Sequence, residues 1–162
     1  MIIKLEELRT KPNQKEKFSY TTSEVEDIKL LSPLEVEGEI SYIEDEIFVR
    51  GHYRVKVGAP CVKCLKEVAI SLDGEYDGHY SEGEKYSKHM SSLKKECDIK
   101  ENYLEEAVHG EIDITELVRE FIILDMPPYP ACEPACDGLE EMEKYSKDDV
   151  DPRWQELLNL KN

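Results

Sequence analysis

The chain has 162 residues, 40% of them hydrophobic, and a formal net charge of −16 from 37 acidic and 21 basic side chains. This length suits about one domain with a hydrophobic core, and the composition excludes a chain that is disordered throughout. The acidic balance excludes general attraction to nucleic acid or anionic membranes, so a polyanionic partner would need a local basic patch. No apolar run reaches the roughly 18–20 residues that span a bilayer, and the N-terminus does not resemble a signal peptide. We therefore expect a cytoplasmic protein with no membrane partner.

Alternating apolar and polar residues predict strands in a β-rich region over residues 1–80. We expect short strands over 1–8 and 15–21 and longer strands over 33–43, 47–57 and from 68 onward. One face of the strand at 47–57 is apolar and the other is charged, which is typical of a sheet with one face in water. The predicted architecture is an antiparallel meander or a barrel-like sheet.

A tight turn at residues 44–47 would set the register between the two longer strands. It predicts the cross-strand pairs Glu39–His52, Glu37–Arg54 and Glu35–Lys56. Such a register makes one charge-complementary face and one apolar face.

The remainder of the chain is predicted to be polar and then helical. Residues 81–100 are expected to form a long loop or a partly ordered excursion, and residues 101–162 to form helices and loops. Asp113 is a predicted N-cap for a helix that the Pro127-Pro128 pair stops, and a last helix is expected over 151–160. The fold class is therefore α+β, with two or more helices in the C-terminal half of a single domain over 1–162.

Four of the five cysteines occur in two closely spaced pairs, Cys61-x-x-Cys64 and Cys132-x-x-x-Cys136, and Cys97 stands apart. Structural zinc sites take four such ligands in two pairs, so these residues are candidate ligands of one zinc ion. The alternative is that they are free cysteines packed against the core, with no cofactor. A thioredoxin-type redox pair fits less well, because strands are predicted on both sides of Cys61 and Cys64.

A basic stretch runs from Arg50 to Lys66. These 17 residues carry +5, so the other 145 carry −21. Its candidate RNA-binding residues are Arg50, His52, Arg54, Lys56, Lys63 and Lys66. The alternative, which the residues alone favour, is an ordinary ladder of surface ion pairs with the glutamates of the neighbouring strand. No nucleophile, phosphate-loop or metalloprotease motif is present, so we do not expect an enzyme.

Three stretches resemble the YceD family, whose members are associated with accumulation of large-subunit ribosomal RNA. They are GHYRVKVGAPCVKCL (51–65), EIDITELVREFIILDMPPYPACEPACDGL (111–139) and DPRWQELLNL (151–160). The resemblance implies a non-enzymatic role in synthesis, processing or stability of the large-subunit (23S) rRNA. The implied partners are this rRNA or its precursor, or an assembly factor.

The resemblance also bears on the two candidate sites. Many members carry a further Cys-x-x-Cys after the segment that ends at Gly138-Leu139, and this chain lacks it. A metal site here would then combine Cys132 and Cys136 with Cys61 and Cys64, or it has been lost. The basic stretch becomes the best candidate for an RNA contact. The alternative is an acidic adapter that binds a basic ribosomal protein without touching RNA.

Overall fold

The computed structural model describes residues 1–93 and 104–138. The chain divides into two compact units: unit 1 comprises residues 1–59 and 69–128, and unit 2 comprises residues 60–68 and 129–162. The single domain over 1–162 stays a prediction. Cys97 and the helix expected over 151–160 lie outside the described residues.

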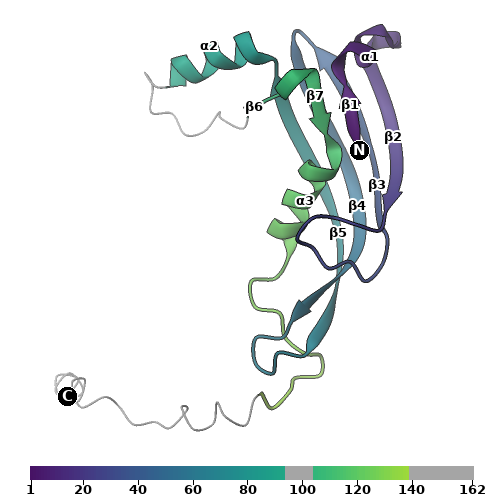
Figure 1. The fold of residues 1–162 in the computed structure, drawn as a ribbon, viewed down its shortest axis with the longest axis vertical. Helices are drawn as coiled ribbons and strands as arrows, with labels where there is room; N and C mark the ends of the chain where they lie inside the picture. The colour runs from purple at the N-terminus through teal and green to yellow at the C-terminus, as the bar shows by residue number, and fades with distance from the viewer. Residues whose placement is uncertain (94–103, 139–162) are drawn as a thin grey trace, which may run out of the picture. The chain divides into compact units, whose positions relative to one another are not determined.

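The described elements form two sheets with helices (Figure 1). In chain order they are β1 (Ile2–Lys4), α1 (Leu5–Thr10), the 3-10 turn η1 (Pro12–Gln14), β2 (Lys15–Thr22), β3 (Leu34–Ile43), β4 (Glu46–Pro60), β5 (Glu67–Ser81), α2 (Gly83–Leu93), β6 (Leu104–Glu106), the 3-10 turn η3 (Val108–Gly110), β7 (Glu111–Asp113) and α3 (Ile114–Asp125). The larger sheet has the order β2-β3-β4-β5-β6, and β1 pairs with β7 in the smaller one. This confirms a β-rich N-terminal half followed by helices.

The predicted meander is confirmed for the first four strands of the larger sheet. β2, β3 and β4 are antiparallel neighbours, β5 follows β4, and β6 adds in parallel to β5. The described part of this sheet is open, with β2 and β6 at its edges, so it gives no support to the barrel-like alternative.

The alternation predicted for β3 and β4 is confirmed by burial. In β4, Ile47, Val49, Tyr53 and Val55 are buried, while the residues between them face outward. Gly38 and Gly51 pair with each other on the buried face. A Cβ on either glycine would lie 2.6 Å or less from the hydroxyl oxygen of Tyr76, so the tyrosine ring occupies the space that these glycines leave.

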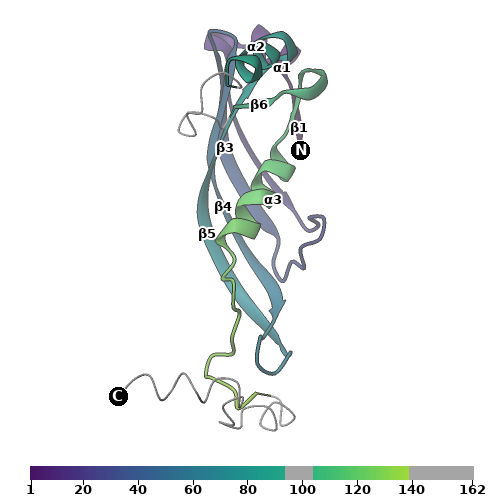
Figure 2. The ribbon, with the colours of Figure 1, turned by 90° about the vertical axis from the view of Figure 1, so that its left-hand side faces the viewer.

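Helix α3 covers the apolar face of the larger sheet beside β4 and β5, as Figures 1 and 2 show. The predicted cap is confirmed, because the Asp113 carboxylate accepts hydrogen bonds from the amides of Thr115 (2.9 Å) and Glu116 (3.4 Å). The apolar stripe of the helix is buried, and the helix ends at Asp125, before the two prolines. Tyr53 of β4 donates a hydrogen bond of 2.5 Å to the Asp125 carboxylate, which fastens the end of α3 to the sheet.

The predicted register of β3 and β4 is wrong by two residues. The observed pairs are Glu35–Arg54, Glu37–His52 and Glu39–Arg50. The turn contains only Glu44 and Asp45, which both have positive φ (51° and 65°), and Ile43 pairs directly with Glu46. A shift of two keeps every side chain on its face, so the apolar and charged faces were still assigned correctly.

Three other predictions need correction. Residues 1–8 are not one strand, because only Ile2–Lys4 is extended and α1 follows. The segment predicted to be a loop from 81 contains helix α2. The region after 101 includes the short strands β6 and β7 as well as α3. Among the described helices, none is long and apolar enough to cross a membrane.

Candidate metal centre

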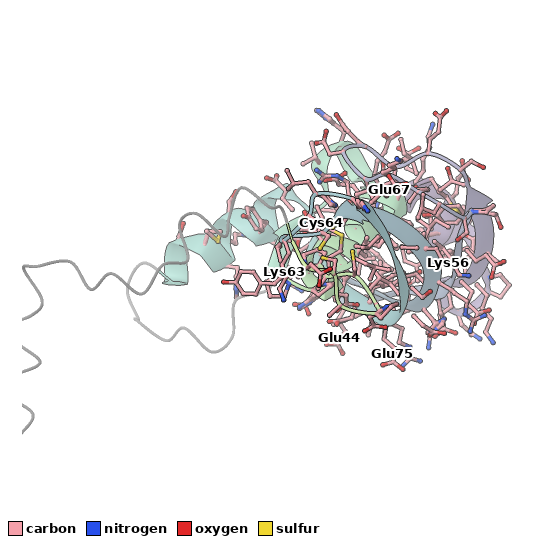
Figure 3. The ribbon with its side chains drawn as sticks, turned by 90° about the horizontal axis from the view of Figure 1, so that it is seen from below. Glu44, Lys56, Lys63, Cys64, Glu67 and Glu75 are labelled. Atoms are coloured by element: carbon pink, nitrogen blue, oxygen red, sulfur yellow. The ribbon has the colours of Figure 1, made fainter. Side chains whose placement is uncertain are left out.

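The first cysteine pair lies in the turn that joins β4 to β5. The amide of Cys61 donates to the carbonyl of Lys66 (2.8 Å), and the amide of Leu65 donates to the carbonyl of Cys61 (3.0 Å). The amide of Lys63 points at the sulfur of Cys61, at 3.4 Å. Figure 3 shows sulfur atoms gathered beside the labelled Cys64 at this turn. The turn thus aims both sulfurs to one side, with a backbone donor on one of them.

The second pair is held against this turn by backbone contacts within unit 2. The amide of Val62 donates to the carbonyl of Pro130 (2.8 Å), two residues before Cys132. On the other side of the pair, Gly138 has a φ of +86°, and a Cβ there would lie 3.6 Å from the carbonyl oxygen of Lys63. The loop that carries Cys132 and Cys136 therefore touches the turn at both ends.

The sulfurs of Cys61, Cys64, Cys132 and Cys136 all lie within 4.8 Å of one another. Between the pairs, the Cys61 and Cys136 sulfurs are 3.7 Å apart and the Cys64 and Cys132 sulfurs are 3.5 Å apart. A zinc ion with four thiolates at about 2.3 Å needs tetrahedral edges of about 3.8 Å. A disulfide needs sulfurs about 2.05 Å apart, so the arrangement fits a metal far better than two disulfides.

The burial pattern of unit 2 gives a separate reason to expect a metal. Among its described residues only Cys61 is buried, while Val62 and Leu65 expose 45% and 65% of their surfaces. Hydrophobic burial therefore contributes little to holding the described part of the unit together. Small units with so little core are generally stabilised by metals or disulfides, and four free thiols converge at this point.

The thiols have unequal acidities. Hydrogen bonds from the backbone amides of Cys64 and Lys63 lower the pKa of Cys61 to about 6, because they stabilise its thiolate. Hydrogen bonding to Cys64 and Cys61 raises the pKa of Cys132 to about 12, and the thiol of Cys64 likewise raises the pKa of Cys136. A metal cation bound among these four thiols would favour the thiolate form of all of them at once. The four cysteines fit one zinc ion, which would hold the turn and loop together.

The structure separates the candidate RNA-binding residues into two groups. Arg50, His52 and Arg54 lie on the outward face of β4 and all have acidic partners. Arg50 forms an ion pair with Glu39 (3.3 Å) and Arg54 with Asp73 of β5 (3.0 Å), and the ring of His52 hydrogen-bonds to the same Asp73 carboxylate (2.5 Å). The other three candidates are exposed and make no ion pair with any residue in 1–93 or 104–138. They are Lys56 in unit 1 and Lys63 and Lys66 in unit 2.

Sequence reasoning missed two partners on this outward face. Asp73 of β5 neutralises Arg54 of β4, on the side of β4 opposite to Glu39 of β3. The alternating pattern of β5, predicted to lie beside β4, was the signal that could have identified this partner. Phe48, an exposed aromatic side chain on the same face of β4 as Arg50, is stacked on His79 of β5, with ring centroids 4.4 Å apart. His79 in turn contacts Glu46 at 3.0 Å. These contacts support the ion-pair interpretation for this part of the basic stretch.

The fold and the site define a small protein of mixed α/β structure with a four-cysteine cluster of metal-binding geometry and no recognised catalytic motif. The chain belongs to the YceD family, described as large ribosomal RNA subunit accumulation protein, which matches residues 49–161. The match includes both cysteine pairs, and the family is named for accumulation of an RNA and not for a reaction. Comparison with curated proteins and with solved structures found no match.

Proposed function

We propose that this protein supports accumulation of the large-subunit rRNA by binding this rRNA or its precursor, without catalysis. The contact is the turn of residues 61–66, where Lys63 and Lys66 are exposed and unpaired among the described residues. This placement of two cations is the observation that carries the proposal, because the family name supplies the RNA and the turn supplies a local positive charge. Arg50, His52 and Arg54 are assigned to the ion-pair ladder and not to the RNA contact.

The zinc ion that we assign to the four cysteines has a structural task in this proposal. It would fix the turn to the loop of residues 132–136, so that Lys63 and Lys66 keep one arrangement toward the RNA. A preformed contact loses less conformational entropy on binding than a loose one. The exposed Val62 and Leu65 beside the lysines offer apolar surface on which unpaired bases can rest.

The test is binding of the full-length protein to single-stranded fragments of the large-subunit rRNA over a range of salt concentrations. Each lysine–phosphate contact adds about 0.7 to the slope of log K against log salt for single strands. The variant Lys63→Glu/Lys66→Glu is therefore expected to reduce the slope by about 1.4 and to weaken binding at low salt.

The matched control is Lys4→Glu/Lys88→Glu, which makes the same change in net charge at two exposed positions of unit 1. It is expected to keep most of the affinity. Equal losses in the two variants would refute a local contact at the turn. No measurable rRNA binding by the parent would leave the adapter that binds a basic ribosomal protein as the surviving hypothesis.

A further inference from the structure

Unit 1 carries a groove on the outward face of the larger sheet, opposite to the face that α3 covers. Its volume is about 790 Å³, and it crosses four neighbouring strands from β2 to β5. The charged side chains around it are Lys17, Glu37, Glu39, Arg50, Glu75 and Asp77. The paired glycines Gly38 and Gly51 lie between these side chains, and their missing side chains would have pointed into the core. The floor of the groove is therefore backbone, which an extended ligand can approach closely.

The charges around the groove do not balance. Four carboxylates face two permanent cations, and one of these cations, Arg50, already pairs with Glu39. Within the described part of the chain, Glu37, Glu75 and Asp77 make no ion pair, and all three are exposed. A hollow with excess charge of one sign concentrates its field, so the net negative groove attracts cations and repels phosphate groups.

We propose that this groove binds an extended, lysine- and arginine-rich segment of a partner protein. Across the sheet, Glu37 on β3 and Glu75 on β5 are two strand spacings apart, about 10 Å. An extended chain advances about 3.3 Å per residue and points alternate side chains to the same side. Cationic side chains two and four residues apart, about 7 and 13 Å, therefore bracket this spacing and reach both carboxylates through their flexible stems. The four strands span about 14 Å, which accommodates about four residues of such a segment.

The occupant is a protein segment and not an RNA strand, because three unpaired carboxylates would face the phosphates of the RNA. A second copy of this chain is also disfavoured, since each copy carries a formal charge of −16. The inference goes beyond the proposed RNA contact and does not depend on it, because the groove is built entirely from residues of unit 1. It gives the protein a second binding surface, of opposite charge to the turn.

The experiment uses the full-length protein and a labelled ten-residue peptide of alternating lysine and serine, followed by fluorescence anisotropy. Three comparison probes are the same peptide with glutamate in place of lysine, the polyamine spermidine as competitor, and a single-stranded RNA. We expect the lysine peptide to bind and the glutamate peptide not to bind, and spermidine to displace the lysine peptide only at large molar excess. The RNA is expected to bind at the turn alone, so the groove substitutions below should not change its affinity. Binding of the RNA to the groove, or equal binding of the two peptides, would overturn the proposal.

Two pairs of variants locate the binding. Glu37→Gln/Glu75→Gln/Asp77→Asn removes the unpaired charges and is expected to weaken peptide binding about tenfold or more. Its matched control neutralises three exposed carboxylates elsewhere in unit 1, Glu6→Gln/Glu7→Gln/Glu24→Gln, and is expected to change binding less than threefold. Equal effects of the two triples would show attraction by net charge alone and would overturn a specific groove.

The second pair changes shape without changing charge. Ser19→Tyr places a ring at the edge of the groove and is expected to weaken peptide binding at least fivefold. The control Ser71→Tyr lies on the outward face of β5 but outside the groove, and it is expected to leave peptide binding unchanged. Both positions are exposed strand positions that tolerate tyrosine, so circular dichroism and thermal midpoints should match those of the parent.

The groove and the turn can fail separately. The triple variant in the groove is expected to leave rRNA binding undiminished, and Lys63→Glu/Lys66→Glu is expected to leave peptide binding undiminished. The groove proposal is refuted if the triple variant and Ser19→Tyr both fold normally and both bind the peptide with the affinity of the parent. This holds even if the rRNA contact at the turn is confirmed.

Discussion

The hydrogen bond between Tyr53 and Asp125 gives a quantitative test of how α3 is held on the sheet. Tyr53 is fully buried, so Tyr53→Phe keeps the ring packed. The change removes only the hydroxyl, which donates a hydrogen bond of 2.5 Å to the Asp125 carboxylate. Hydrogen bonds to charged groups contribute about 1.5–3 kcal/mol. Asp125 is exposed and can regain water, which puts the expected loss near the lower end, at about 1.5 kcal/mol.

The assay is urea unfolding of the full-length protein followed by far-ultraviolet circular dichroism, with Asp125→Asn as the companion variant. An amide still accepts the hydrogen bond, and a carboxylate at a helix C-terminus is unfavourable, so Asp125→Asn should cost clearly less than Tyr53→Phe. The thermal midpoint of Tyr53→Phe should fall by about 3–6 °C. A loss below about 0.3 kcal/mol for Tyr53→Phe, or a larger loss for Asp125→Asn, would refute the reasoning.

Three further predictions follow from other contacts. Burial raises the pKa values of Tyr76 and Tyr80, so the folded protein holds these protons more tightly than the unfolded chain, and stability should fall as the pH rises above about 10. Tyr76→Phe/Tyr80→Phe should reduce the slope of that fall by about 2.7 kcal/mol per pH unit, measured by urea unfolding at a series of alkaline pH values; an unchanged slope would contradict it. Elemental analysis should find about one zinc per chain in the parent and almost none in Cys64→Ser, and zinc-free parent protein would contradict the metal centre. Asp113→Ala should lower the free energy of unfolding by about 1 kcal/mol through loss of the α3 cap, whereas Asp113→Asn should recover most of it.

The parts of the fold that the sequence predicted are those with a repeating signal. The alternation in β3 and β4 and the capped stripe of α3 each depend on many residues that agree, so they were identified with the correct faces. The register failed because the turn residues Glu44 and Asp45 adopt positive φ without a glycine, and a glycine is what marks such two-residue turns in sequence. The strands β6 and β7 have three residues each, too few for any period to show.

The candidate sites divided in the same way. The spacing of Cys61 with Cys64 and of Cys132 with Cys136 predicted two ligand pairs, since each spacing is a local property of one turn. Whether the pairs meet depends on contacts such as the one between Val62 and Pro130, which no spacing encodes. The basic stretch was visible in the sequence, but its neutralisation by Asp73 depends on the order of the strands.

The metal centre and the proposed RNA contact are physically coupled, because the described part of unit 2 buries only Cys61. Without an ion, the turn that carries Lys63 and Lys66 would be held to the loop of residues 132–136 mainly by the backbone contact at Val62. Removal of zinc by a chelator should therefore weaken rRNA binding, while peptide binding by the groove of unit 1 should persist. Loss of both activities on chelation would mean that the metal supports unit 1 as well, and loss of neither would mean that the turn keeps its shape without a metal.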